Sequence, residues 1–148
     1  MAPSQEAMEI ITRKKQQYCR FADSNQWHEF DNIMMPDFTA EFFNAEGEIH
    51  VENNTEYRFA SLEEWRGYFS KAFEQLQTIH IVSPAEFEEV SPDEIKAIFT
   101  VLYHAGTKSD TGMHGTGGGH YHEIWKRKGD DWFMQSMKMN RLYWKVLA

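Results

Sequence analysis

The stretch GHYHEIWKRKGDDWFM (residues 119–134) predicts two β-strands joined by a tight turn. Aromatic and aliphatic residues alternate with polar ones on both sides of KGDD (128–131), and glycine and aspartate are typical turn residues. We therefore expect strands at 118–127 and 131–139 that pair antiparallel across this turn.

More strands precede this hairpin in the chain. Alternating segments at 78–83, 85–90 and 96–104 are typical of strands, and SPDE (91–94) supplies another turn. The glycine-rich segment 106–119 has no apolar pattern, so we expect a long, mobile loop that could serve as a lid. The C-terminal half therefore predicts a run of antiparallel strands.

The N-terminal half is helical instead. Helical spacing of apolar residues predicts a helix that begins after Ser4 and is broken at residues 23–26. A short helix carrying Trp27, Phe30 and Met34 then ends at Pro36.

A strand and a second long helix follow. PDFTAEFF (36–43) alternates as a strand, and the polar segment 44–60 predicts a hairpin or loop. Ser61 and Glu64 form a capping box at the start of a helix with one apolar stripe.

Helices first and antiparallel strands afterwards predict one α+β domain over residues 1–148. We expect the helices to pack on the concave face of one curved, mostly antiparallel sheet, so that the two layers enclose a pocket. Five aromatic residues are candidates for its wall: Phe42, Phe69, Phe73, Trp125 and Trp132.

Composition limits the classes of function. The formal net charge is −8, which argues against nucleic-acid binding because that binding needs clustered Lys and Arg. Apolar runs are too short to cross a membrane, and the N-terminus is unlike a signal peptide. The single cysteine, Cys19, is expected in the core. These features predict a soluble, cytoplasmic protein.

The placement of the seven histidines carries the strongest functional signal. His120 and His122 are two residues apart in a predicted strand, so they point to the same face. His104 ends another strand and His80 lies inside TIHIV (78–82). Imidazoles that converge on the inner face of a sheet indicate either a proton-handling pocket or a metal site.

The order of these segments resembles the SnoaL-like branch of the NTF2-like superfamily, and within it scytalone dehydratase and its fungal relatives. The resemblance extends over roughly residues 8–144 and is distributed over many short matches. These matches are WHEFDNIMMPDF, SLEEWRGYF, TIHIV, EVSPDEIKAIFTVLYH and GHYHEIWKRKGDDWFM.

The resemblance implies a cone-shaped α+β fold and enzymes that use no metal and no organic cofactor. Such enzymes dehydrate, isomerise or cyclise small molecules of polyketide or terpenoid type by acid–base chemistry. The family's catalytic Asp matches Asp23 in FADSNQW, and its catalytic His matches His80. His104 resembles a second pocket histidine, and His120 and His122 occupy the positions of substrate-holding Ser and Asn residues.

The chain also departs from the dehydratase pattern. That enzyme activates its substrate carbonyl through two tyrosines, and the matching residues here are Ala22 and Phe42, which carry no hydroxyl. The specific dehydration of scytalone is therefore not implied.

The pairing of Asp23 with His80 has a simple physical logic. A carboxylate that accepts the Nδ1–H fixes the tautomer of the imidazole and leaves Nε2 free as a base with a pKa near neutrality. Catalytic residues are thus expected at Asp23 and His80. Substrate-binding residues are expected at His104, His120, His122, Phe42, Phe69, Phe73 and Trp125.

Two alternatives remain open. A metal-dependent enzyme could use His104, His120 and His122 as ligands, since an H-x-H pair and a third histidine can hold zinc or iron. A non-catalytic, ligand-binding module of the same fold is also compatible with the loss of both tyrosines.

A homo-oligomer, dimer or trimer, is the expected assembly, through the outer face of the sheet. Its candidate contacts are Tyr103, Tyr121, Trp125 and Met139, and Glu123 is expected at the surface or an interface. His28, His50 and His114 lie in polar surroundings and are expected at the surface.

Overall fold

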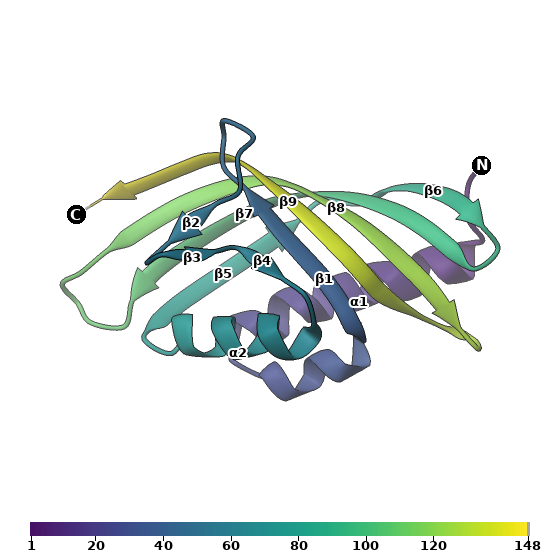
Figure 1. Ribbon diagram of the computed structural model, residues 1–148, viewed down its shortest axis with the longest axis horizontal. Coiled ribbons are helices and arrows are strands. Elements are labelled where there is room, and N and C mark those ends of the chain that lie inside the picture. The colour runs from purple at the N-terminus through teal and green to yellow at the C-terminus, as the bar shows by residue number, and fades with distance from the viewer. Residues whose placement is uncertain (148) are drawn as a thin grey trace.

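A computed structural model describes residues 1–147 (Figure 1). The helical elements are α1 (Gln5–Asp23), the 3-10 helix η1 (Trp27–Asn32) and α2 (Leu62–Ala72). The strands are β1 (Met34–Phe43), β2 (Val51–Glu52), β3 (Thr55–Glu56), β4 (Arg58–Phe59), β5 (Leu76–Val82), β6 (Glu86–Ser91), β7 (Glu94–Thr107), β8 (His114–Lys128) and β9 (Asp131–Leu147).

The main sheet has the order β4-β1-β9-β8-β7-β5, and β6 adds to β7. Only the β1–β9 pair is parallel among the strand pairs of the described residues, so the sheet is mostly antiparallel. The sheet curves around α1 and α2, which lie on the same side of it (Figure 1). The predicted α+β class, with helices on one face of a curved sheet, is confirmed.

Local sequence explains where the helices begin and end. The Ser4 hydroxyl accepts from the Ala7 N–H at 3.2 Å, and the Ser61 hydroxyl accepts from the Glu64 N–H at 3.1 Å, so both predicted N-caps are confirmed. After Asp23 the chain turns through Asn25, whose φ of 57° no α-helix can continue.

The second helix is shorter than predicted. It ends at Asn32, and Met34 already begins β1, with Pro36 inside the strand. The pairing of β1 with β9 is interrupted between Met34 and Thr39, so Pro36 lies where the ladder is irregular.

The predicted mobile loop 106–119 is mostly strand instead. β7 continues to Thr107 and β8 starts at His114, which leaves a short connection. The glycines permit close strand contact, because a Cβ on Gly119 would overlap the carbonyl oxygen of Asn140 and one on Gly118 would overlap that of Val101. Glycine here marks close backbone approach within a strand rather than a lid.

The inward face of β7 and β8 is the opposite of the predicted one. Tyr121, Glu123 and Trp125 are buried, whereas His122 is exposed and His120 is half-buried. The predicted outer-face residues Tyr103, Tyr121, Trp125 and Met139 all point inward, so they are not available for an outer contact.

The burial of Glu123 accounts for the inward face of β8. Glu123 was expected at the surface but is 1% exposed, and its Oε2 lies 2.5 Å from the Nζ of Lys15 in α1. The Lys15 ammonium also lies over the rings of Tyr18 and Tyr121, at 3.8 and 3.7 Å from their centroids. A buried charge is tolerated when it is paired in this way.

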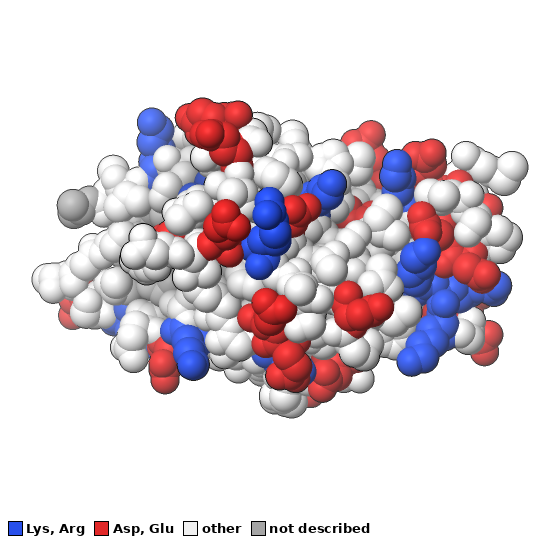
Figure 2. Space-filling model, viewed as in Figure 1, with Lys and Arg blue, Asp and Glu red and all other residues white. Residues whose placement is uncertain are grey.

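No helix within residues 1–147 is long and apolar enough to span a membrane. Acidic and basic side chains are interspersed on the face shown in Figure 2. Cys19 is buried as predicted, and burial raises the pKa of its thiol to about 11.

Candidate functional site

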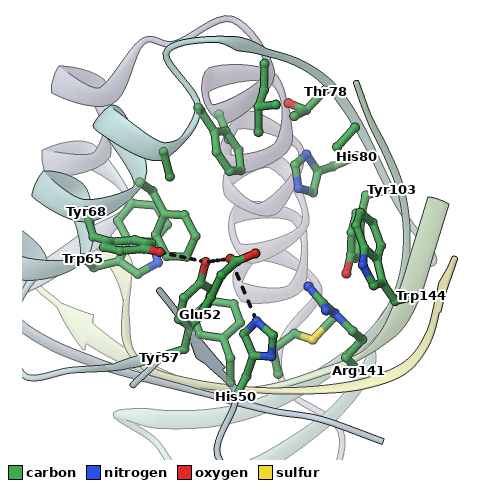
Figure 3. Close-up of a pocket in the computed structure, with 18 of the residues that line it drawn as sticks. His50, Glu52, Tyr57, Trp65, Tyr68, Thr78, His80, Tyr103, Arg141 and Trp144 are labelled. Carbon is green, nitrogen blue, oxygen red and sulfur yellow. Dashed lines mark hydrogen bonds and ion pairs between the residues drawn. The ribbon is translucent and has the colours of Figure 1, made fainter. Parts of the chain in front are cut away.

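A cavity of about 320 Å3 lies between the helices and the concave face of the sheet (Figure 3). Phe42, Phe69 and Phe73 line it, as predicted. Trp125 is instead fully buried in the core, where its indole N–H donates to Glu123 at 2.9 Å. Trp132 is likewise buried in the core. The wall is completed by Trp27, Trp65 and other aromatic residues from both helices, so the cavity suits a flat apolar ligand.

Asp23 and His80 meet at the edge of this cavity. The Nδ1 of His80 lies 2.6 Å from the Oδ1 of Asp23, and the two side chains are only 11% and 16% exposed. Two more bonds fix the carboxylate: the Thr78 hydroxyl donates to Oδ1 and the backbone N–H of His80 donates to Oδ2, both at 2.9 Å. Asp23 thus accepts three bonds from one strand.

The fold explains why these residues meet. Asp23 is the last residue of α1, and α1 packs along β5, in which Thr78 and His80 are two apart and face inward. Because an ionised carboxylate can only accept, Nδ1 of His80 carries the proton in this arrangement and Nε2 is the free nitrogen. His80 lines the cavity, so a basic nitrogen is available to a ligand.

Two near-parallel aromatic rings lie next to the imidazole. Phe73 stacks on His80 at 6.2 Å between centroids, and Tyr103 stacks on it at 5.6 Å. Trp144 continues the row beyond Tyr103 at 5.7 Å. These four residues line the cavity, and His80, Tyr103 and Trp144 are seen along one side of it in Figure 3.

A second polar cluster lies across the cavity and was missed at the sequence level (Figure 3). The Tyr68 hydroxyl donates to the Tyr57 hydroxyl at 3.0 Å, and Tyr57 donates to Glu52. The Nε2 of His50 lies 4.0 Å from the same Glu52 carboxylate. All four residues line the cavity. Burial raises the pKa of Tyr57, so its phenol stays protonated.

His50 was expected at the surface, which is wrong, because its side chain is only 19% exposed. Burial lowers its pKa, and the positive charge of Arg141 lowers it further. Only the pairing of residues 50–57 with β1 brings this cluster over the cavity, through bonds from His50 N–H to Phe42 and from Phe42 N–H to Tyr57.

Arg141 in β9 is the other missed residue. It lines the cavity beside Tyr103, and its guanidinium carbon lies 4.9 Å from the centroid of the Trp144 ring. Burial raises the pKa of Tyr103, and Arg141 opposes that rise. No sequence pattern marks Arg141, since one basic residue in an exposed-looking strand end is common.

The other predicted histidines lie away from the cavity. His104 and His122 are exposed and His120 is half-buried, and all three lie on the outer face of the sheet. His120 pairs with Thr100, which is about 13 Å along β7 from His104 at ~3.3 Å per residue. The substrate-binding positions and the metal site predicted for these three histidines are therefore wrong. Residues 1–147 contain no group of three or more His, Cys, Asp or Glu side chains placed to hold an ion.

Comparisons with known proteins identify the family of this chain. The family model of the SnoaL-like domain matches residues 3–138. "Probable cyclase FGR4" of Gibberella zeae is 57% identical over 149 residues, covering 100% of this chain and 99% of that protein.

Solved structures show the same fold at low identity. The "Putative Scytalone Dehydratase" of Novosphingobium aromaticivorans has a TM-score of 0.77 at 15% identity, over 95% of this chain and 87% of that one. The hexachlorocyclohexane dehydrochlorinase LinA-type3 of Novosphingobium barchaimii has a TM-score of 0.72 at 16% identity, over 96% and 88%. Together with the family match and the 57% identical relative, these findings establish that the chain belongs to the SnoaL-like domain family of the NTF2-like superfamily.

Proposed function

We propose that this protein is a cofactor-free acid–base enzyme that acts on a small cyclic ketone or alcohol of polyketide origin. The observation that carries the proposal is the Asp23–His80 pair, with Nδ1 and Oδ1 2.6 Å apart at the edge of an aromatic cavity. A carboxylate held by three donors and an imidazole stacked with two rings are pre-organised for proton transfer.

In the proposed mechanism, Nε2 of His80 removes a proton from the carbon next to the substrate carbonyl. Asp23 stabilises the imidazolium that forms, because its carboxylate accepts the Nδ1–H. Negative charge then develops on the carbonyl oxygen, which needs a donor. Tyr103, which stacks on His80 and has a protonated phenol, is the donor that we assign to it.

Tyr103 takes the place of the two dehydratase tyrosines, because among the tyrosines of the cavity it is the one that stacks on His80. The lining residue Ala22 and the ring of Phe42 carry no hydroxyl at the positions of the dehydratase tyrosines. His104 and His122, which were expected to polarise the substrate, lie on the outer face. Tyr103 has both the position in the cavity and the exchangeable proton.

Among the possible outcomes of proton removal, we propose ring closure, in which the enolate carbon attacks a second carbonyl carbon of the same molecule and the resulting alkoxide takes back the proton from the His80 imidazolium. Dehydration, double-bond isomerisation and cyclisation share the first step, so the residues around His80 do not distinguish them. The relative named "Probable cyclase FGR4" is 57% identical along the whole chain, which supports cyclisation over the dehydration and dehydrochlorination suggested by the names of the distant structural neighbours.

The test follows the first step alone, so it does not require the natural substrate. Enzyme is incubated with a bicyclic ketone such as 2-tetralone in D2O, and deuterium incorporation next to the carbonyl is measured by NMR. We expect His80→Ala and Asp23→Asn each to lower the exchange rate at least about 10²-fold, since that is the usual contribution of a general base.

His120→Ala is the matched control, because His120 lies on the outer face, and it should exchange at the wild-type rate. Full exchange in a folded His80→Ala variant would refute the assignment of the base. Tight binding of ketones with no enzyme-dependent exchange in the wild type would favour a ligand-binding module instead.

A further inference from the structure

We infer that the ligand of this cavity carries an anionic oxygen group, such as a carboxylate, that Arg141 binds. The inference rests on the proposed function only in taking this cavity as the substrate site. It adds the chemical class of the substrate: a planar cyclic compound with the reacting ketone at one end and the anionic group at the other.

Arg141 lines the cavity without an ion-paired carboxylate among residues 1–147. The carboxylate of Glu52 lines the same cavity but accepts the Tyr57 hydroxyl. The Arg141 side chain is half-buried in the cavity wall, where a charge-assisted bond to an anionic group of the ligand is stronger than in open water.

Arg141 lies against an aromatic ring of the cavity wall. Its guanidinium lies 4.9 Å over the ring of Trp144, a distance typical of stacking and cation–π contact. One side of the guanidinium lies against this ring and Tyr103 is a second neighbour, and an arginine fork has further N–H donors with which to bind a carboxylate.

A row of aromatic rings connects Arg141 with the proposed base, His80. The row Phe73, His80, Tyr103 and Trp144 runs from one end of the cavity wall to the other with interplanar angles of 19° to 29°. A planar molecule lying along this row would place one end at His80 and the other at Arg141 (Figure 3). The site would thereby fix which ring carbon faces Nε2.

The pKa shifts of the neighbouring groups register the positive charge of Arg141 in the cavity, where the negative charge of Glu52 opposes it. Arg141 contributes to lowering the pKa of His50, which burial lowers first, and it opposes the rise in the pKa of Tyr103. The same positive potential attracts an anion.

The experiment compares two ligands of nearly equal shape, the anion 2-naphthoate and the neutral ketone 2-acetonaphthone, by calorimetric titration near pH 7. We expect the wild type to bind the carboxylate at least about tenfold more tightly. Arg141→Met should abolish this preference while leaving the affinity for the ketone within about threefold. Arg13→Met, at an exposed position of α1, is the matched control and should keep the preference.

Equal affinity for the two ligands, no carboxylate binding up to about 1 mM, or a preference retained in Arg141→Met would each overturn the inference. The wild-type comparison alone decides the matter if Arg141→Met does not fold. His80→Ala should retain the carboxylate preference although it loses deuterium exchange. If the wild type prefers the carboxylate but catalyses no deuterium exchange, only the proposed function is refuted. If it catalyses the exchange but shows no preference for the carboxylate, only the anion site is refuted.

Discussion

Replacing Glu123 by glutamine is expected to destabilise the fold strongly while preserving its shape. Glutamine has nearly the volume of glutamate, and its amide oxygen can still accept the Trp125 indole N–H. The change removes only the negative charge that lies 2.5 Å from the Lys15 ammonium, where both side chains are 0% exposed. Lys15 is then left buried without a counter-ion.

The magnitude follows from that geometry. Breaking a fully buried ion pair by removing one partner costs about 3–5 kcal/mol, against a total stability of about 5–15 kcal/mol for a domain. At about 2–4 °C per kcal/mol for chains of this length, the melting temperature should fall by roughly 6–20 °C. The contacts of Lys15 with the rings of Tyr18 and Tyr121 remain, and they place the expected value toward the lower end.

Urea unfolding followed by tryptophan fluorescence, with calorimetry as a second probe, measures the effect. The control is Asp93→Asn, which breaks the pair of Asp93 with Arg127, whose side chains are 70% and 46% exposed, and should cost less than about 1 kcal/mol. The double variant Lys15→Met/Glu123→Gln should recover most of the loss, because it removes the unpaired charge. A loss below about 1 kcal/mol for Glu123→Gln, or no recovery in the double variant, would refute the reasoning.

Three further predictions concern other parts of the chain. Thr78→Val removes one of the three donors to Asp23 and should slow deuterium exchange by roughly 2- to 10-fold, the rate equivalent of one hydrogen bond; an unchanged rate would show that the bond is dispensable. Gly119→Ala should destabilise the protein by about 1–3 kcal/mol or more in urea unfolding, because the new Cβ overlaps the Asn140 carbonyl oxygen, whereas a neutral result would mean that the strands separate easily. Burial lowers the pKa of His50 in the folded protein below its ordinary value of about 6.5, so the unfolded chain takes up a proton at this residue more readily as the pH falls. The contribution of His50 to the free energy of unfolding should therefore be present above about pH 6.5 and decrease at lower pH. His50→Gln should make the free energy of unfolding less dependent on pH between about pH 5 and 7.

Element order and type could largely be predicted from the sequence. The capping residues Ser4 and Ser61 are local signals, because each side chain bonds a backbone N–H three residues away. The alternation of Phe38 and Ala40 predicts their side of β1 for the same local reason. The prediction was wrong for the segment 106–119, which is mostly strand. Glycine occurs both in flexible turns and where two strands approach closely, and a single sequence does not distinguish the two cases.

The candidate site divides in a similar way. The adjacency of Asp23 and His80, 57 residues apart, was implied by the family resemblance and not by any spacing in the chain. The cluster of His50, Glu52 and Tyr57 and the guanidinium of Arg141 carry no sequence signal, because each is an ordinary polar residue until the fold brings them to one cavity.

What the sequence by itself determined was the set of helices and strands, since caps, turns and periodicity act over a few residues. What only the tertiary structure decided was which face of β7 and β8 points inward. In those strands both faces carry apolar and polar residues, and shifting the choice by one residue exchanges every side chain between core and surface. Glu123 can face the core only because Lys15 reaches it from α1, more than a hundred residues away, and that choice turns Tyr103 toward the cavity and His104 toward solvent.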